Sequence, residues 1–295
     1  MPELAEVEHF RRRWAVAVGE RIRTVSVHRN ARVFRACDVA ALVEDLPGRR
    51  LLSSEAAGKQ MLFGFSGGAW LGIHLGMTGS LEFVNPDATA TATATDTATA
   101  TAPAPAPADR HDHLVLETPS GRLVFRDPRL FGRIRFDRGR GAPAWWLAIP
   151  PPLTSDEFML ADLGTFLDRR AKSPLKAVLL MQERFPGVGN WMADEILWRA
   201  ELHPARQAGS LDLPERRRLY RWLRWVCRES MRVVAPSFAD PPASWLFRHR
   251  WSDGGLCPRT GHALVRETIG GRTTCWSPGR QPSPRKLVKK STSRG

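Results

Sequence analysis

The start of the chain carries apolar residues at helical spacing, namely Leu4, Val7, Phe10 and Trp14. This pattern predicts a helix that begins at about Leu4 and ends near Gly19. Residues 21–28 then alternate apolar and polar side chains, which predicts a strand. Further short β-like runs, punctuated by glycine and turn residues, lie within 49–83, 113–117, 122–126 and 132–137. The first half of the chain is therefore predicted to be rich in β-structure.

The second half of the chain has helical periodicity. It predicts helices over residues 173–184, 190–202 and 212–234, with Asp212 as the N-cap of the last helix. Residues 247–281 predict a short hairpin. Two segments, 87–109 (Ala, Thr and Pro repeats) and 282–295 (basic, with Pro and Ser), cannot bury a core and are predicted to be disordered.

The charge of the chain points to its partner. The formal net charge is +14 over 295 residues, which favours an anionic polymer, and nucleic acid before membrane because there is no long apolar run. Four cysteines form no CxxC pair and predict no disulfide framework. Charged residues interrupt the first twenty positions, so we expect no signal peptide and a cytoplasmic protein.

The first six residues combine an amine with two carboxylates. Removal of Met1 would leave Pro2 with a free secondary amine, which forms a cationic iminium with an aldehyde carbon. Glu3 follows directly, and Glu6 lies one helical turn further on. An equally simple explanation is that acidic residues favour the first turn of any helix.

A glycine-rich turn, Gly187 to Asn190, lies between two predicted helices. Glycines allow close approach of a phosphate, and the next helix N-terminus presents free N–H groups, so this turn suits a DNA backbone. Asn190 could donate to a phosphate and cap the helix, and Lys176 on the preceding helix could add a charge. The alternative is a plain helical hairpin.

Two predicted turns follow strands and carry apolar residues at their tips: residues 74–79, with His74 and Met77, and residues 127–132, with Arg129 and Phe131. Exposed apolar tips beside arginine suit a protein that fills the gap left by an extruded nucleotide. The alternative is that both residues fold inward as minor core. Lys59 is a candidate phosphate contact, although a single lysine is usually only solvated.

Taken in order, these motifs resemble those of the formamidopyrimidine-DNA glycosylase and endonuclease VIII family of base-excision repair enzymes. The segments that carry the resemblance are MPEL and EVE at the start, HLGMTGS at 74–80, DPRLFG at 127–132, GVGNWMADEILWRAELHP at 187–204 and RTTCWSPGRQ at 272–281. The resemblance implies an α+β fold, with an N-terminal helix and β-sandwich over 1–150, a helix-two-turn-helix domain over 151–246 and a finger hairpin over 247–281.

The resemblance also implies a bifunctional glycosylase and abasic-site lyase, monomeric, acting on double-stranded DNA that contains oxidised bases or abasic sites. Pro2 would attack the sugar carbon that bears the damaged base, and Glu3 would serve as general acid and base. Lys59 would contact a phosphate beside them, Glu6 and Glu195 would support the site, and DNA contacts would come from His74, Met77, Arg129, Phe131, Lys176, Asn190 and Arg272.

The finger departs from the family's commonest pattern, which has two CxxC pairs separated by sixteen residues. In the register set by RTTCWSPGRQ, those four positions hold Cys257, Thr260, Ser277 and Arg280. We therefore expect a zincless finger with no metal and no other cofactor, held by packing, with Arg272 at its tip. Cys275 replaces an aromatic residue in this register and is not a ligand.

Other departures bear on activity and on the lesion. Ala5 replaces a usual proline, Leu130 an arginine and Met192 an aromatic residue. The segment 238–245 is shorter than the damage-capping loop that guanine-specific members carry at this place. This difference favours oxidised pyrimidines as the lesion. Two other functions fit the composition: a catalytically impaired DNA-damage-binding protein of the same fold, and a ribosome-associated RNA binder that would leave Pro2 and Glu3 unexplained.

Overall fold

The computed structural model describes residues 2–28, 31–85 and 109–283. The expectations for residues 87–108 and for the tail from 284 onward lie outside these described residues. The chain divides into two compact units, Met1–Pro151 with Ser230–Ala239, and Pro152–Glu229 with Asp240–Gly295. Among the described residues, no helix is both long enough and apolar enough to cross a bilayer.

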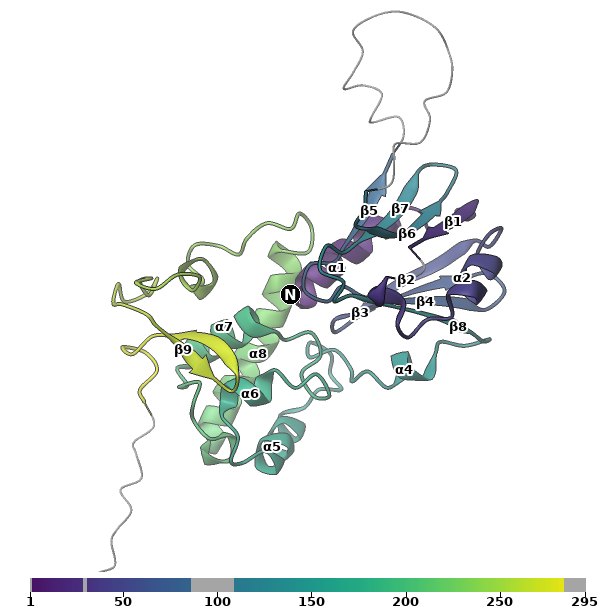
Figure 1. The fold of residues 1–295 in the computed structure, drawn as a ribbon. Helices are drawn as coiled ribbons and strands as arrows, with labels where there is room; N and C mark the ends of the chain where they lie inside the picture. Colours follow the sequence, from purple (N-terminus) through teal and green to yellow (C-terminus); the bar gives the residue numbers. More distant parts are fainter. Residues whose placement is uncertain (1, 29–30, 86–108, 284–295) are drawn as a thin grey trace, which may run out of the picture. The chain divides into compact units, whose positions relative to one another are not determined.

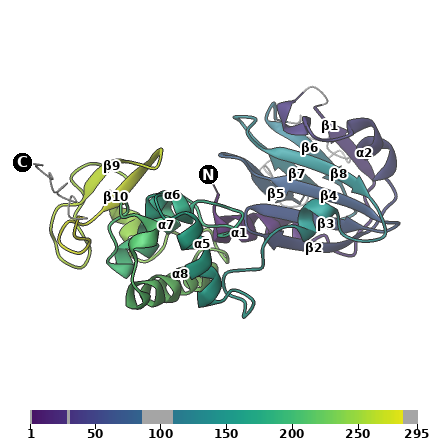
Figure 2. The ribbon, with the colours of Figure 1, turned by 90° about the horizontal axis from the view of Figure 1, so that it is seen from below.

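The first unit contains two four-stranded antiparallel sheets (Figures 1 and 2). One has the order β1 (Thr24–Val27), β6 (Asp112–Glu117), β7 (Arg122–Arg126), β5 (Ser80–Val84), and the other β2 (Leu51–Ala57), β3 (Gln60–Phe65), β4 (Ala69–His74), β8 (Arg133–Arg138). Alternate side chains of both sheets, such as Phe125 and Phe63, share one buried core. The predicted β-sandwich is confirmed.

Helix α1 (Leu4–Ala15) packs across β2 and β5 of this sandwich. Trp14 is fully buried, its ring lies 5.0 Å from that of Phe63, and its Nε1 donates to the carbonyl of Glu82. The helix ends four residues before Gly19, because the chain after Ala15 continues as turns toward the left-handed Gly19 (φ +97°). Three short helical segments complete the unit: η1 (Arg32–Phe34), α2 (Val39–Asp45) and α4 (Ala144–Leu147).

The second unit is helical and ends in a hairpin. Its elements are α5 (Leu160–Arg169), α6 (Leu175–Leu179), α7 (Asn190–Ala200), η2 (Ala208–Ser210), α8 (Leu213–Val233), η3 (Leu246–His249), β9 (Val265–Ile269) and β10 (Arg272–Trp276). Every residue of α7 after Asn190 is buried, so this helix forms the centre of the unit. Asp212 caps α8 as predicted, since its Oδ1 accepts the N–H of Glu215 at 2.8 Å.

Two further sequence-based boundaries differ from the structure. The helix predicted over 173–184 is only five residues long, because residues 181–187 form turns that lead to the glycine-rich segment. Residues 230–239, which we expected within the helical domain, group with the first unit instead. The reason is packing: Val234 and Ala235 form a buried cluster with Ala5 of α1.

Candidate functional site

The N-terminal residues are ordered by the start of α1. Glu3 is the N-cap residue, is only 3% exposed, and forms a capping box with Glu6, whose Oε2 accepts the Glu3 N–H at 2.5 Å. Pro2 stands immediately before this cap and is half-buried. The structure therefore holds the Pro2 nitrogen and two carboxylates within one helical turn, with Glu6 fixing the backbone of Glu3.

Lys59 and His74 lie beside each other at the end of the second sheet. Lys59 is in the turn between β2 and β3 and is 9% exposed, and Gln60 pairs with His74 across β3 and β4. Burial, followed by the positive charges of Lys59 and Arg133, lowers the pKa of His74 to about 4. Since Nδ1 of the neutral ring accepts the N–H of Gly76 at 3.0 Å, Nε2 carries the proton and is the donor.

Asp127, which the sequence analysis did not single out, ties the two apolar-tipped loops together. It is fully buried, and its Oδ1 accepts the hydroxyl of Thr78 at 2.8 Å while its Oδ2 accepts the N–H of Gly132 at 2.6 Å. Gly76 (φ +63°) lies so close to the backbone of Phe131 that a Cβ would sit 2.4 Å from its carbonyl carbon. The two loops are thus one rigid structure.

The tips of these loops point outward. Met77 is 44% exposed and Phe131 is 41% exposed, so neither has folded into the core. The guanidinium of Arg129 lies 5.0 Å from the centre of the Phe131 ring. The chain places two apolar side chains and one cation together at the surface, as a wedge for stacked bases requires.

The glycine turn of the second unit is stabilised by Gln182. Its Nε2 donates to the carbonyl of Val188 at 2.8 Å and its Oε1 accepts the N–H of Gly187 at 3.1 Å, which fixes Gly187 at φ +88°. The expected capping by Asn190 is wrong, because Gly189 is the N-cap of α7 and Asn190 is the first helical residue. Asn190 instead donates from Nδ2 to the carbonyl of Thr273 at 2.9 Å.

Lys176 is turned inward. It is fully buried, and its Nζ donates to the carbonyl of Asn190 at 2.7 Å and pairs with Asp194 at 2.5 Å. In this geometry the buried ammonium of Lys176 stabilises the first turn of α7. Lys176, which we expected to contact phosphate directly, instead supports Asn190 through a hydrogen bond to its carbonyl.

Asp194 is a second residue that the sequence analysis missed. Its carboxylate is fully enclosed and receives Lys176 on one oxygen, and on the other the guanidinium of Arg250 at 2.6 Å and the N–H of Cys275 at 3.1 Å. Cys275 is in β10, so Asp194 fixes the strand that carries Arg272. In the sequence the signal was the adjacent carboxylates Asp194 and Glu195 among the mainly apolar residues of α7.

Glu195, next to it, joins α7 to η3. Its Oε2 accepts the N–H of Leu246 at 2.8 Å and its Oε1 accepts Nε of Arg199 at 2.7 Å. Burial raises the pKa of Glu195 to about 7, against the opposing effect of Arg199. Arg199 lies over four tryptophan rings, those of Trp198, Trp222, Trp225 and Trp245, at 4.2–5.6 Å. Glu195 therefore supports the fold of the second unit.

The finger hairpin presents Arg272 at its turn. Strands β9 and β10 are antiparallel, with Val265 opposite Trp276 at one end and Ile269 opposite Arg272 at the other. The turn between them contains two glycines in the left-handed region, Gly270 (φ +62°) and Gly271 (φ +76°). Arg272 is exposed there. Its neighbour Thr273 is the residue that Asn190 binds, so two predicted DNA-contacting positions lie side by side.

The four positions that correspond to zinc ligands do not suit a metal. Cys257 is 1% exposed, and its Sγ accepts a hydrogen bond from Trp198 Nε1 at 3.4 Å. Arg280 pairs with Glu201 at 2.7 Å, and neither it nor Thr260 and Ser277 is a usual zinc ligand. No group of three or more His, Cys, Asp or Glu side chains that could hold a metal occurs within the described part of the chain.

Cys257 predicts a pH-dependent finger. Burial raises the pKa of its thiol, but hydrogen bonds from Thr260, Ser277 and others outweigh this and lower the pKa to about 7. A folded pKa below the unfolded one adds stability that is complete above pH 9 and is lost as the pH falls through 7. Thermal unfolding of Cys257→Ser should therefore show a larger loss at pH 9 than at pH 6. Cys37→Ser is the control, since burial raises the pKa of Cys37 to about 12, and an equal loss at both pH values would contradict the assignment.

The comparisons with known proteins agree with one another over most of the chain. The family model described as formamidopyrimidine-DNA glycosylase N-terminal domain matches residues 1–134, and that of the helix-two-turn-helix domain of the same glycosylase matches residues 150–239. A formamidopyrimidine-DNA glycosylase of Thermus thermophilus is 36% identical over 292 residues, which cover 94% of this chain and 97% of that protein. One of Solibacter usitatus is 34% identical over 240 residues, 81% of each chain.

Solved structures show the same fold. A crystal structure of the Lactococcus lactis glycosylase bound to DNA with an abasic site has a TM-score of 0.79 and 23% identity, covering 95% of this chain and all of that one. A structure of a related glycosylase with DNA that contains a carbocyclic 8-oxoguanine has a TM-score of 0.81 and 24% identity, covering 96% and 100%.

Proposed function

Because the chain belongs to the formamidopyrimidine-DNA glycosylase family, we propose that it removes oxidised bases from duplex DNA through a Schiff base at Pro2 and then cleaves the strand. The observation that carries this proposal is that one compact unit holds both the capped Pro2–Glu3 terminus and the exposed pair Met77 and Phe131. The Pro2–Glu3 terminus supplies the groups that react at the sugar, and Met77 and Phe131 supply the wedge that keeps a nucleotide extruded.

In the first step the Pro2 nitrogen, free once Met1 is removed, attacks the sugar carbon that bears the damaged base. A C–N bond to Pro2 forms as the bond to the base breaks, and the base leaves with that electron pair and takes up a proton from solvent. The ring opens to a cationic iminium, which withdraws electrons from the adjacent carbon. Loss of a proton there expels the phosphate and nicks the strand.

Glu3 moves the protons in this scheme. The α1 N-terminus favours its ionised form, while near-complete burial favours the neutral form. An ionised carboxylate accepts the proton released as the amine attacks and returns one when the sugar ring opens. General acid–base catalysis of this kind contributes about 10²–10⁴-fold.

The remaining predicted residues bind the DNA. His74, with its Nε2–H, and Lys59 supply donors to phosphate in the first unit, and Arg129 stands beside Phe131. In the second unit Asn190 and Arg272 contact the DNA backbone. The buried residues Lys176, Asp194 and Glu195 support them. We propose that the enzyme acts as a monomer without a resident metal, in the cytoplasm and on the nucleoid.

The lesion we propose is an oxidised base, with pyrimidines favoured. The short segment after α8 supports this, because Phe238 packs against His9 and Phe10 of α1, with ring centres 5.1–5.2 Å apart, and few residues remain to cap a purine. A second candidate, a damage-binding protein without activity, is suggested only by the degenerate finger.

The deciding experiment is a nicking assay on duplexes that each carry one lesion. We expect strand cleavage at oxidised pyrimidines and at abasic sites, and none at an undamaged base. Salt-sensitive binding without cleavage of any duplex would instead establish the damage-binding protein.

Replacement of Arg272 by alanine should slow lesion processing by about 10-fold, because one phosphate contact, worth about 1–2 kcal/mol, is lost. The melting temperature should stay unchanged, since the side chain is exposed. Arg221→Ala, on the outer face of α8, is the matched control. Kinetics equal to wild type would remove Arg272 from the interface.

A further inference from the structure

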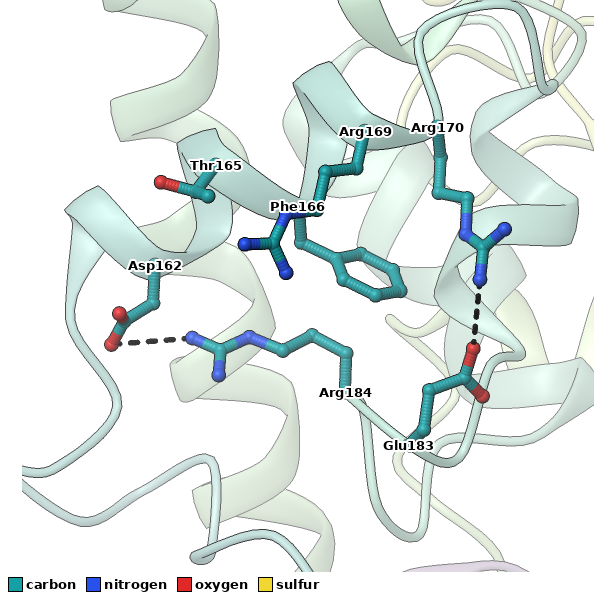
Figure 3. A pocket seen from close by; sticks show the side chains of 7 residues that line it. All are labelled: Asp162, Thr165, Phe166, Arg169, Arg170, Glu183 and Arg184. Atoms are coloured by element: carbon teal, nitrogen blue, oxygen red, sulfur yellow. Dashed lines mark hydrogen bonds and ion pairs between the residues drawn. The ribbon is translucent and has the colours of Figure 1, made fainter.

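A depression of about 620 Å³ lies in the second unit between α5 and the segment that precedes the glycine turn. Asp162, Thr165, Phe166, Arg169 and Arg170 line it from α5 and its C-cap, and Glu183 and Arg184 face them (Figure 3). None of these residues belongs to the motifs that carry the family resemblance. Three arginines around one aromatic ring form a site for an anionic group.

The charges in this depression do not cancel. Arg170 pairs with Glu183 at 3.4 Å, and Arg184 pairs with Asp162 at 3.2 Å. Arg169 projects between them (Figure 3), and the described part of the chain offers it no ion pair. One positive charge is therefore left over within the depression.

Arg184 supplies a second sign of a missing ligand. Its side chain is 21% exposed, with the guanidinium 5.0 Å from the Phe158 ring, yet its Nε is buried and has no hydrogen-bond partner among the described residues. A buried donor without an acceptor is unfavourable, because it has lost its hydrogen bonds to water without replacing them. An anion bound between Arg169 and Arg184 would provide that acceptor.

The depression adjoins the glycine turn along the chain. Arg184 is three residues before Gly187, and the segment between them follows Gln182, which binds both Gly187 and Val188. If one phosphate of a DNA strand binds at the Gly187–Asn190 turn, the neighbouring phosphates of that strand would lie near the segment that precedes the turn. A phosphate suits these arginines, because the N–H donors of a planar guanidinium group can bind two phosphate oxygens at once.

We propose that Arg169 and Arg184 bind a backbone phosphate of the DNA flank, beyond the contacts at the glycine turn. This inference rests on the proposed function, because it requires that the chain bind duplex DNA. It extends the interface of the second unit from the turn to the C-terminal end of α5. The site would hold the duplex outside the lesion and add affinity without reading the sequence.

Binding measurements on the full chain test this with two duplexes that share a central abasic-site analogue but differ in length. Arg169→Ala should weaken binding to the longer duplex by about 3–10-fold, and lower the slope of log affinity against log salt by about 0.9, as loss of one phosphate contact predicts. Binding to the short duplex, and nicking of it, should match wild type. Arg221→Ala is the control for a lost surface charge.

Three outcomes would overturn the proposal. Equal affinities and salt slopes for wild type and Arg169→Ala on the long duplex would remove the contact. Equal weakening by Arg221→Ala would show a general charge effect. Stabilisation of wild type but not of Arg169→Ala by inorganic phosphate, with DNA affinity unchanged, would assign the site to a free phosphate. Failure of the wild type to bind any duplex would instead refute the proposed function itself.

Discussion

Reduction with borohydride in the presence of abasic-site DNA should leave this protein covalently attached to the strand. The iminium that Pro2 forms with the opened sugar is the species that borohydride reduces to a stable amine. A single residue left in front of Pro2 converts the amine to an amide and should abolish both the adduct and nicking. Pro2→Gly, which leaves a primary amine at a displaced position, should lower the yield of adduct by about 10²-fold. The measurement is the shift of labelled DNA on a denaturing gel.

The geometry of α1 gives this experiment its controls. Glu3→Gln removes the proton carrier but keeps the nucleophile, so turnover should fall by about 10²–10⁴-fold. Glu8→Gln changes a carboxylate on the same helix that only binds Arg11 and Arg12, and it should behave as wild type. An undiminished adduct in Pro2→Gly, or none in wild type, would mean that the nucleophile is elsewhere.

Local sequence patterns predicted the strands and the helices α1, α7 and α8, because each depends on neighbours along the chain, but they did not predict α2 or α5. Alternation predicted the strands, the spacing of Leu4 to Trp14 predicted α1, and Asp212 predicted the start of α8. The exposure of Met77 and Phe131 was one of two open alternatives. Asp127 explains this outcome, because its hydrogen bonds hold both loops together while their apolar tips stay exposed.

What the sequence could not predict depends on contacts between distant residues. Lys176 and Asp194 are eighteen residues apart, and Arg250 is fifty-six beyond Asp194. Nothing in a local pattern shows that three charges so far apart meet in one buried site. For the same reason the inward direction of Lys176 and the bond from Asn190 to Thr273 emerged only from the structure.

Removal of the Asp194 carboxylate should be the most destabilising single change in the second unit. In Asp194→Ala the fully buried Lys176 and the 4%-exposed Arg250 would lose the carboxylate with which both pair, and uncompensated buried charge costs about 3–5 kcal/mol. For a unit of this size that lowers the melting temperature by about 6–20 °C. Thermal unfolding followed by circular dichroism measures the shift.

Two further variants separate the charge from the rest of the side chain. Asp194→Asn keeps the shape and an acceptor for the N–H of Cys275, but it still leaves both cations unpaired, so it should lose most of the same stability. Asp168→Ala breaks the exposed pair with Arg216 and should cost at most about 1 kcal/mol. Because Asp194 also fixes β10, Asp194→Asn should weaken DNA binding even below its melting temperature, whereas Asp168→Ala should not. A stable Asp194→Asn with wild-type affinity would show that the finger is held by the hydrophobic cluster around Trp198 and Cys275, independently of this carboxylate.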